Sequence, residues 1–194
     1  MRGTALWSTQ RSSGSAASTP WWRTPASSTS RRSRSFRRSG GTRSSRSSLT
    51  SPFLLAKYAW EALAASSDGR FLAVASVHGL VASPFKVGYV AAKHGVLGLV
   101  KVLALEGASV GISAAALCPA FVRTPLVEAQ ITAQAEAHGL PEEQVLEDVI
   151  LAPHAVKRLL EPEEVAETAA FLLGAGGRSI TGAPVVMDLG WSAR

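Results

Sequence analysis

The sequence contains no asparagine and only one cysteine, Cys118, among its 194 residues. A single thiol excludes an intrachain disulfide, so nothing in the cysteine content indicates an oxidising compartment, and we expect a cytoplasmic protein. The four histidines are too scattered for the ligand spacing of a zinc site, and we predict no metal site. No uninterrupted apolar run reaches the roughly 18 residues of a membrane span, so we expect no membrane partner.

Residues 1–50 lack lysine and acidic residues but hold ten arginines, whereas residues 51–194 hold ten basic and fourteen acidic residues. The first segment therefore carries +10 and the second carries −4, which together give the net charge of +6. Ser, Arg, Thr, Gly and Pro dominate the first segment, which shows neither helical nor strand periodicity. Because so polar a segment buries too little apolar surface to offset chain entropy, we predict that residues 1–48 are disordered.

Three interpretations of this arginine-rich segment remain open. An acid-poor, Arg/Ser-rich N-terminus is typical of an organellar transit peptide. A basic arm of this kind could also bind nucleic acid through its phosphates, or an acidic partner, which would make the chain a nonenzymatic binding protein. The third interpretation, which we favour, is a GC-rich coding region translated out of frame, which also yields Arg, Ser, Pro and Gly.

From Leu49 onward, helical patterns alternate with short apolar runs typical of buried strands. We predict helices over residues 49–66, 87–108, 125–137, 141–151 and 161–173, and strands over residues 71–76, 112–119 and 183–188. This order predicts an α/β domain with a largely parallel sheet. The strands read as apolar runs without alternation, which indicates burial on both faces.

Three residues that could take part in catalysis lie at or after the end of the first predicted strand. Tyr89 and Lys93 are four apart in a predicted helix, so both side chains emerge on one face. Ser76 ends the strand, and ligands of open α/β sheets bind outside the carboxyl ends of strands. An ammonium about 4 Å from the phenol would stabilise its phenolate by about 4 kcal/mol at an effective dielectric constant near 20, about three pKa units. Tyr89 would then be a general acid/base; the simpler alternative is a Tyr–Lys pair on an exposed helix face.

The longer pattern distinguishes these two interpretations. Tyr89 comes thirteen positions after Ser76, and Lys93 comes four positions after Tyr89. A helix and a strand ending in Cys118-Pro119 follow. With the segments SVHGLVASPFKVGYVAAKHGVLGLVK, CPAFVRTPLVEAQI and ITGAPVVMDLGWSAR, this pattern resembles the short-chain dehydrogenase/reductase family over residues 49–194. The resemblance implies the C-terminal part of a Rossmann-like doubly wound parallel sheet. It also implies an NAD-dependent oxidoreductase that interconverts D-3-hydroxybutyrate and acetoacetate, and a homo-oligomer, tetrameric in relatives.

The same resemblance implies a role for each matching residue. Ser76 would orient the substrate oxygen, Tyr89 would be the acid/base, and Lys93 would lower the Tyr89 pKa and hold the nicotinamide ribose. The implied substrate-carboxylate residues are His78, Lys86, Gln130 and Trp191. The implied contacts of the nicotinamide carboxamide are Pro119, Val122 and Thr124. Taken alone, these residues also fit turn, loop, solvent-exposed or packing positions, and Cys118 is best interpreted as an inert core thiol.

The sequence also departs from the family pattern. The glycine-rich phosphate turn Thr-Gly-x-x-x-Gly-x-Gly and the segment Asn-Asn-Ala-Gly are absent, and the family's catalytic asparagine falls at Ser48. Ala120 and Leu189 occupy positions where the family usually has glycine. The resemblance therefore begins abruptly near Ser48, and we expect a frameshift or a wrong start upstream. We also expect poor solubility and little or no activity, because an incomplete sheet leaves an edge uncovered.

Overall fold

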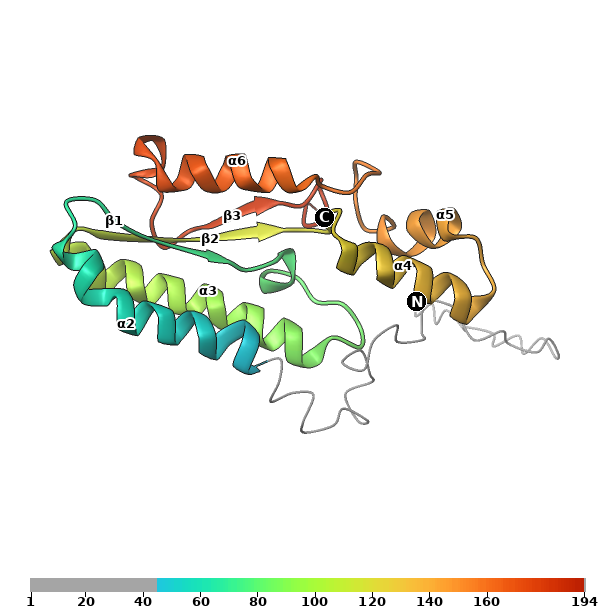
Figure 1. The fold of residues 1–194 in the computed structure, drawn as a ribbon, viewed down its shortest axis with the longest axis horizontal. Coiled ribbons are helices and arrows are strands. Elements are labelled where there is room, and N and C mark those ends of the chain that lie inside the picture. Colours follow the sequence, from blue (N-terminus) through green and yellow to red (C-terminus); the bar gives the residue numbers. More distant parts are fainter. Residues whose placement is uncertain (1–44, 194) are drawn as a thin grey trace, which may run out of the picture.

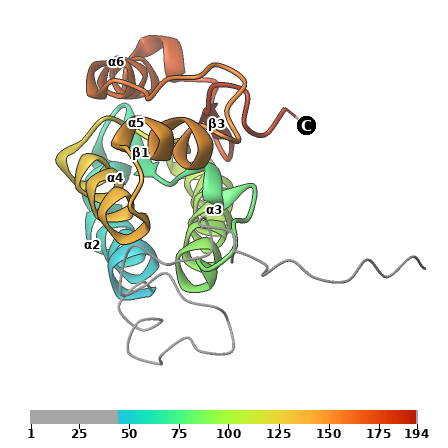
Figure 2. The same cartoon turned by 90° about the vertical axis from the view of Figure 1, so that its right-hand side faces the viewer.

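The structure, a computed structural model, describes residues 45–193 as alternating helices and parallel strands. The elements in chain order are α2 (Ser51–Ala65), β1 (Gly69–Val74), α3 (Val87–Gly107), β2 (Ile112–Pro119), α4 (Pro125–His138), α5 (Glu142–Val145), α6 (Pro162–Leu173) and β3 (Pro184–Met187). Helices α2 and α3 cover one face of the sheet and α6 covers the other, as Figures 1 and 2 show from two sides. This arrangement confirms the predicted Rossmann-like α/β fold with a parallel sheet.

The sheet has the order β1-β2-β3, and both pairings are parallel. The central strand β2 is buried along almost its whole length, as its apolar run ISAAALCP predicted. The same prediction is wrong for β1, since Phe71 and Leu72 are only half-buried and Val74 is 58% exposed. Strand β1 lies at the edge of the described sheet, so nothing covers its last residue.

Most predicted boundaries agree with the structure to within a few residues. Helix α3 ends in a short 3-10 turn that Gly111 closes in the left-handed region, at φ 77°. The predicted helix over 141–151 is α5 followed by one π-helical turn, Leu146–Ile150. A similar turn, Arg46–Thr50, precedes α2, so the helical structure begins slightly before the predicted boundary at residue 48. Residues 1–44, on which the disorder and nucleic-acid interpretations rest, lie outside the described residues.

Small side chains let α3 pack closely against the sheet. Ala114 and Ala116 of β2 are 1% and 0% exposed, and they share one cluster with Val96 and Val100 of α3. A second cluster joins α4, α5 and the following segment through Ile131, Val145 and Leu159 among others. This second cluster holds the α4–α5 unit at the carboxyl end of the strands, where it borders the site described below (Figure 1).

Large apolar side chains remain exposed on the outer faces of α2 and α3. Leu55 and Tyr58 of α2 are 65% and 76% exposed, and Leu105 of α3 is 81% exposed. The helix Val87–Val110 is by length and composition able to cross a membrane; its 18-residue window of highest hydropathy has a mean hydropathy of 1.4, and 33% of that window is buried in the fold. Charged residues such as Lys93 and Glu106 interrupt this segment, which is why uninterrupted apolar runs did not reveal it.

Candidate functional site

Ser76 occupies the point at which the ends of β1 and β2 meet. It is 7% exposed and follows β1 in a fully extended conformation, with φ 179°. Its Oγ accepts a hydrogen bond from the backbone N–H of His78 at 3.2 Å and donates to the carbonyl oxygen of Pro119 at 3.5 Å. The hydroxyl is thereby fixed to the last residue of the central strand, at the carboxyl edge where α/β sheets bind ligands.

The first two turns of α3 bring Tyr89 and Lys93 to this hydroxyl. The Tyr89 side chain forms a hydrogen bond with the side chain of Ser76. The Lys93 ammonium lies 5.6 Å from the centre of the Tyr89 ring and donates to the carbonyl oxygen of Val74 at 2.9 Å. The structure therefore places all three predicted catalytic residues together, with α3 supplying two of them from one face.

The expected net lowering of the Tyr89 pKa does not occur in this structure. Burial raises the pKa of Tyr89 above its usual value, and this effect exceeds the opposing hydrogen bond from Ser76. Burial also lowers the pKa of Lys93. The Lys93 ammonium donates its hydrogen bond to the carbonyl oxygen of Val74, at the end of β1. Desolvation therefore dominates, and Tyr89 is a neutral phenol at neutral pH.

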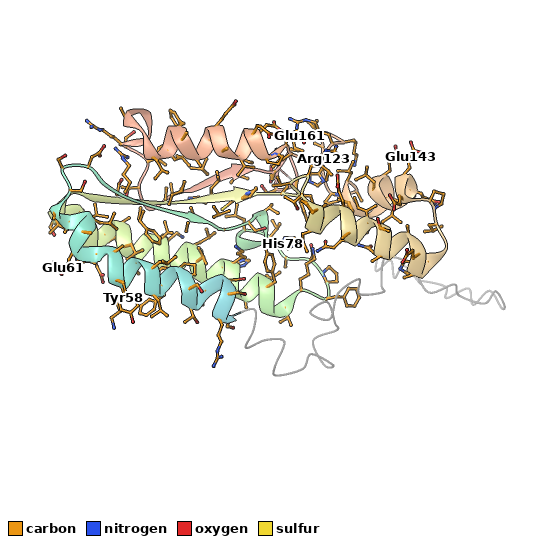
Figure 3. The ribbon with its side chains drawn as sticks, in the orientation of Figure 1. Tyr58, Glu61, His78, Arg123, Glu143 and Glu161 are labelled. Atoms are coloured by element: carbon orange, nitrogen blue, oxygen red, sulfur yellow. The ribbon has the colours of Figure 1, made fainter. Side chains whose placement is uncertain are left out.

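Three of the four predicted substrate-binding residues converge beside Tyr89. His78 is 4% exposed at the carboxyl end of the sheet (Figure 3), with its ring 5.8 Å from that of Tyr89 and 5.2 Å from that of Trp191. Lys86 extends over the ring of Phe121, with its Nζ 5.1 Å from the ring centre. The Phe121 ring in turn stacks on Trp191 at 5.9 Å and 17°. These contacts form one wall, in which the Lys86 cation lies over the Phe121 ring.

Gln130 does not join this wall. It lies half-buried on α4 and makes no hydrogen bond to the other predicted substrate residues in the part of the chain that the structure describes. The structure therefore leaves Gln130 as a prediction only.

Two residues of the wall were missed in the sequence. Phe121 lies between Ala120 and Val122, and no sequence motif or spacing indicates a role for it. Its position just after the end of a strand was the only signal. His154 is 1% exposed, its ring lies 5.4 Å from that of Trp191, and burial lowers its pKa. It is 37 residues from Trp191 in the chain, so no local spacing could have indicated this contact.

The loop after β2 contains the predicted cofactor contacts. Pro119 ends the strand, Val122 forms a β-bridge with Leu160, and Thr124 caps α4 by accepting from the Val127 N–H at 3.3 Å. The bridge uses the N–H of Arg123 and the carbonyl of Phe121, so the N–H and carbonyl of Val122 are not used in it. Within residues 45–193 this N–H and carbonyl have no backbone partner; an adjacent donor and acceptor of this kind fit a carboxamide, and this loop begins at the Ser76 contact. The residues present are thus compatible with a nicotinamide.

The burial of His78 should make the fold sensitive to acid. Burial lowers the pKa of His78 from 6.5 to about 3, so between these values the unfolded chain binds a proton that the folded chain does not. Stability from this residue is therefore complete above pH 6.5 and falls with decreasing pH, by up to about 1.4 kcal/mol per pH unit. We expect His78→Gln to flatten the decline in Tm below pH 6.5 relative to the unchanged chain. Equal slopes in the variant and the unchanged chain would contradict this prediction.

Comparison with known proteins gives consistent similarities. A family profile described as enoyl-(acyl carrier protein) reductase matches residues 26–192. The chain is 50% identical over 126 residues to the D-beta-hydroxybutyrate dehydrogenase of Rhizobium meliloti (65% of this chain, 49% of the relative). It is 42% identical over 146 residues to the protein of the same name from Cupriavidus necator (75% and 57%). The chain thus spans about half the length of these curated relatives.

Solved structures share the fold. Sorbitol-6-phosphate 2-dehydrogenase from Erwinia amylovora superimposes with a TM-score of 0.77 at 25% identity, covering 84% of this chain and 64% of that chain. A 4-hydroxyisoleucine dehydrogenase mutant complexed with NADH and succinate gives 0.73 at 24% identity, covering 85% and 64%. ElxO with bound NADP gives 0.72 at 23% identity, covering 84% and 62%. These likenesses agree with the observed layers and strand order.

Proposed function

This chain belongs to the short-chain dehydrogenase/reductase family, and on that premise we propose that its site interconverts D-3-hydroxybutyrate and acetoacetate with NAD as the cofactor. The observation that carries the proposal is the meeting of Ser76, Tyr89 and Lys93 at the carboxyl ends of β1 and β2. The substrate is proposed from the hydroxybutyrate dehydrogenase relatives together with the cation in the aromatic wall. The proposal of NAD rather than NADP rests on the family resemblance of the sequence.

In the proposed oxidation, the secondary alcohol loses a hydride from carbon and a proton from oxygen. NAD, when bound, would supply the hydride acceptor. Ser76 holds the substrate oxygen and Tyr89 takes the hydroxyl proton, which it returns to the carbonyl oxygen in the reverse reduction. Because burial keeps the phenol neutral, the site at rest is ready to donate a proton, and oxidation requires Tyr89 to lose its proton first. Lys93 uses one N–H on Val74 and keeps two for the ribose.

Lys86 is proposed to bind the substrate carboxylate. Burial lowers the Lys86 pKa, and none of the carboxylates that the structure describes forms an ion pair with this cation. His78 stays neutral and donates or accepts a single hydrogen bond, with its Nε2 3.0 Å from the Ser83 Oγ. A carboxylate next to Lys86 would compensate the buried charge, and the aromatic rings of Phe121 and Trp191 would exclude water from that pair.

The test is a fluorescence assay of NADH formation with D-3-hydroxybutyrate, and the expected result is slow, stereospecific turnover. Lys86→Met should raise KM about tenfold or more, because a hydrogen bond to a charged group contributes about 1.5–3 kcal/mol. Lys101→Met makes the same change at an exposed position of α3 and should leave KM unaltered. Turnover that ignores substrate chirality, or a KM equally changed in both variants, would refute the carboxylate role.

We also propose that the chain self-associates through α2 and α3. Leu55, Tyr58 and Leu105 are more than half exposed on these helices, an apolar surface that a second copy would cover. Sedimentation velocity should show a homo-oligomer, and Leu105→Glu should shift it toward the monomer. A monomeric unchanged chain would refute the proposal.

A further inference from the structure

A cavity of about 390 Å³ opens at the amino ends of the strands, opposite the site just described. Its charged lining comes from three segments: Asp68 before β1, Arg70 within β1, and Arg178 in the loop between α6 and β3. Figure 1 shows that the α2–β1 and α6–β3 loops lie at the same end of the sheet. Gly111 forms another part of the rim, and a Cβ at that residue would meet no atom within 4 Å, as expected beside open space.

The three charged groups form a bridged set with an excess positive charge. One carboxylate oxygen of Asp68 lies 2.8 Å from Nη2 of Arg70, and the other lies 3.4 Å from Nη2 of Arg178. No other ionisable residue lines the cavity among the described residues, so two guanidiniums face one carboxylate. The cavity therefore carries a net charge of +1.

Arg70 is the least satisfied member of this set. Its side chain is only 7% exposed, yet its Nε has no hydrogen-bond acceptor in the described part of the chain. Its Nη1 reaches only the Oγ of Ser113, at 3.4 Å. A guanidinium offers five N–H donors, and leaving them unused away from water costs free energy. Because Arg70 also lines the cavity, an acceptor bound there would supplement the single carboxylate that the two guanidiniums share.

We propose that this cavity binds a phosphate group, either as inorganic phosphate or as part of a phosphomonoester. Phosphate offers several oxygen acceptors with the spacing that a guanidinium fork binds in a bidentate manner. Arg178 is 67% exposed and can turn toward the ligand, while Arg70 is held in place by Asp68 and Ser113. The Ser113 hydroxyl accepts from Arg70, so its own hydrogen is available to a phosphate oxygen. The proposal does not depend on the dehydrogenase assignment.

Substitution of Asp68 tests the proposal, because phosphate binding predicts an increase in affinity rather than a loss. Its carboxylate competes with the ligand for both guanidiniums, so Asp68→Asn should tighten phosphate binding about fivefold, the effect of removing one like charge about 4 Å away in water. A purely structural Arg–Asp–Arg bridge predicts the opposite: loss of stability with no gain in affinity. Arg178→Ala should weaken binding about tenfold or more.

The experiment follows the Tm of the full chain against increasing inorganic phosphate, at ionic strength held constant with chloride, and takes Kd from saturation. The matched control is Arg123→Ala, because Arg123 is also exposed and paired with a carboxylate, Glu161, at 3.0 Å (Figure 3). A parallel titration with adenosine 5′-monophosphate distinguishes the two sources: tighter binding than inorganic phosphate identifies a phosphomonoester site. Non-saturating stabilisation that is equal in all variants, or no tightening in Asp68→Asn, would overturn the proposal.

Discussion

Replacing Tyr89 with phenylalanine is expected to lower kcat for D-3-hydroxybutyrate oxidation by about 10²- to 10⁴-fold, the usual contribution of a positioned acid/base. The ring of phenylalanine keeps the edge-on contact with His78, whose ring centre lies 5.8 Å from that of Tyr89. The phenol oxygen and its bond to Ser76 are lost, so the variant removes the proton acceptor with little change in packing. NADH formation under saturating substrate measures the effect.

The chain provides its own control for this variant. Tyr58 is the only other tyrosine and is 76% exposed on α2, so Tyr58→Phe removes the same atom far from the strand ends. We expect its kcat to equal that of the unchanged chain. If Tyr89→Phe retained the unchanged rate as well, another group would have to move the proton, and the proposed mechanism would fail.

Gly69→Ala is expected to destabilise the fold by about 2–3 kcal/mol, near the upper end for overpacking. A Cβ at this position would lie 2.3 Å from the carbonyl oxygen of Leu63, which is backbone and has little room to move. The contact joins the end of α2 to the start of β1, so relieving it would separate the helix from the sheet. Urea unfolding followed by circular dichroism gives the change in free energy.

The same substitution should have the opposite sign at Gly98. This residue lies within α3, and an added Cβ would meet no atom within 4 Å. Gly98→Ala should therefore stabilise the chain by up to about 1 kcal/mol through helix propensity alone. Loss of stability at Gly98, or an unchanged midpoint for Gly69→Ala, would show that local packing differs from that described.

The sequence predicted the fold well where one local pattern determines one element. Strand β2 is a mostly apolar run between Gly111 and Ala120, and its predicted limits match the structure. The proximity of Tyr89 and Lys93 followed from helical spacing, and that of Ser76 followed from the rule for strand ends. These inferences needed only the period of a helix and the direction of parallel strands.

The parts that could not be predicted depend on contacts between distant segments. The direction of the Tyr89 pKa shift depends on how deeply the phenol is buried, which helical spacing does not reveal. The wall beside the site depends on Phe121 stacking on Trp191, 70 residues later in the chain. Likewise, the exposure of Val74 follows from the place of β1 in the sheet rather than from its apolar sequence.

Leu189 departs from the family pattern at a position whose backbone conformation favours glycine. The family usually has glycine there, and the structure places Leu189 at φ 54°, in the left-handed region that costs other residues about 1–2 kcal/mol. Its carbonyl accepts hydrogen bonds from the N–H groups of Ala155 and Val156, and these contacts fix the turn before Trp191 despite the strain.

Because Cys118 is buried, its rate of reaction with a thiol reagent can report on opening of the fold. The thiol is 0% exposed, and burial raises its pKa, so a sulfhydryl reagent can reach it only during transient opening of β2. With no second cysteine in the sequence, every labelling event reports on the strand that ends beside Ser76. At reagent concentrations at which alkylation is faster than reclosing, the alkylation half-life would give the opening rate of this edge of the sheet.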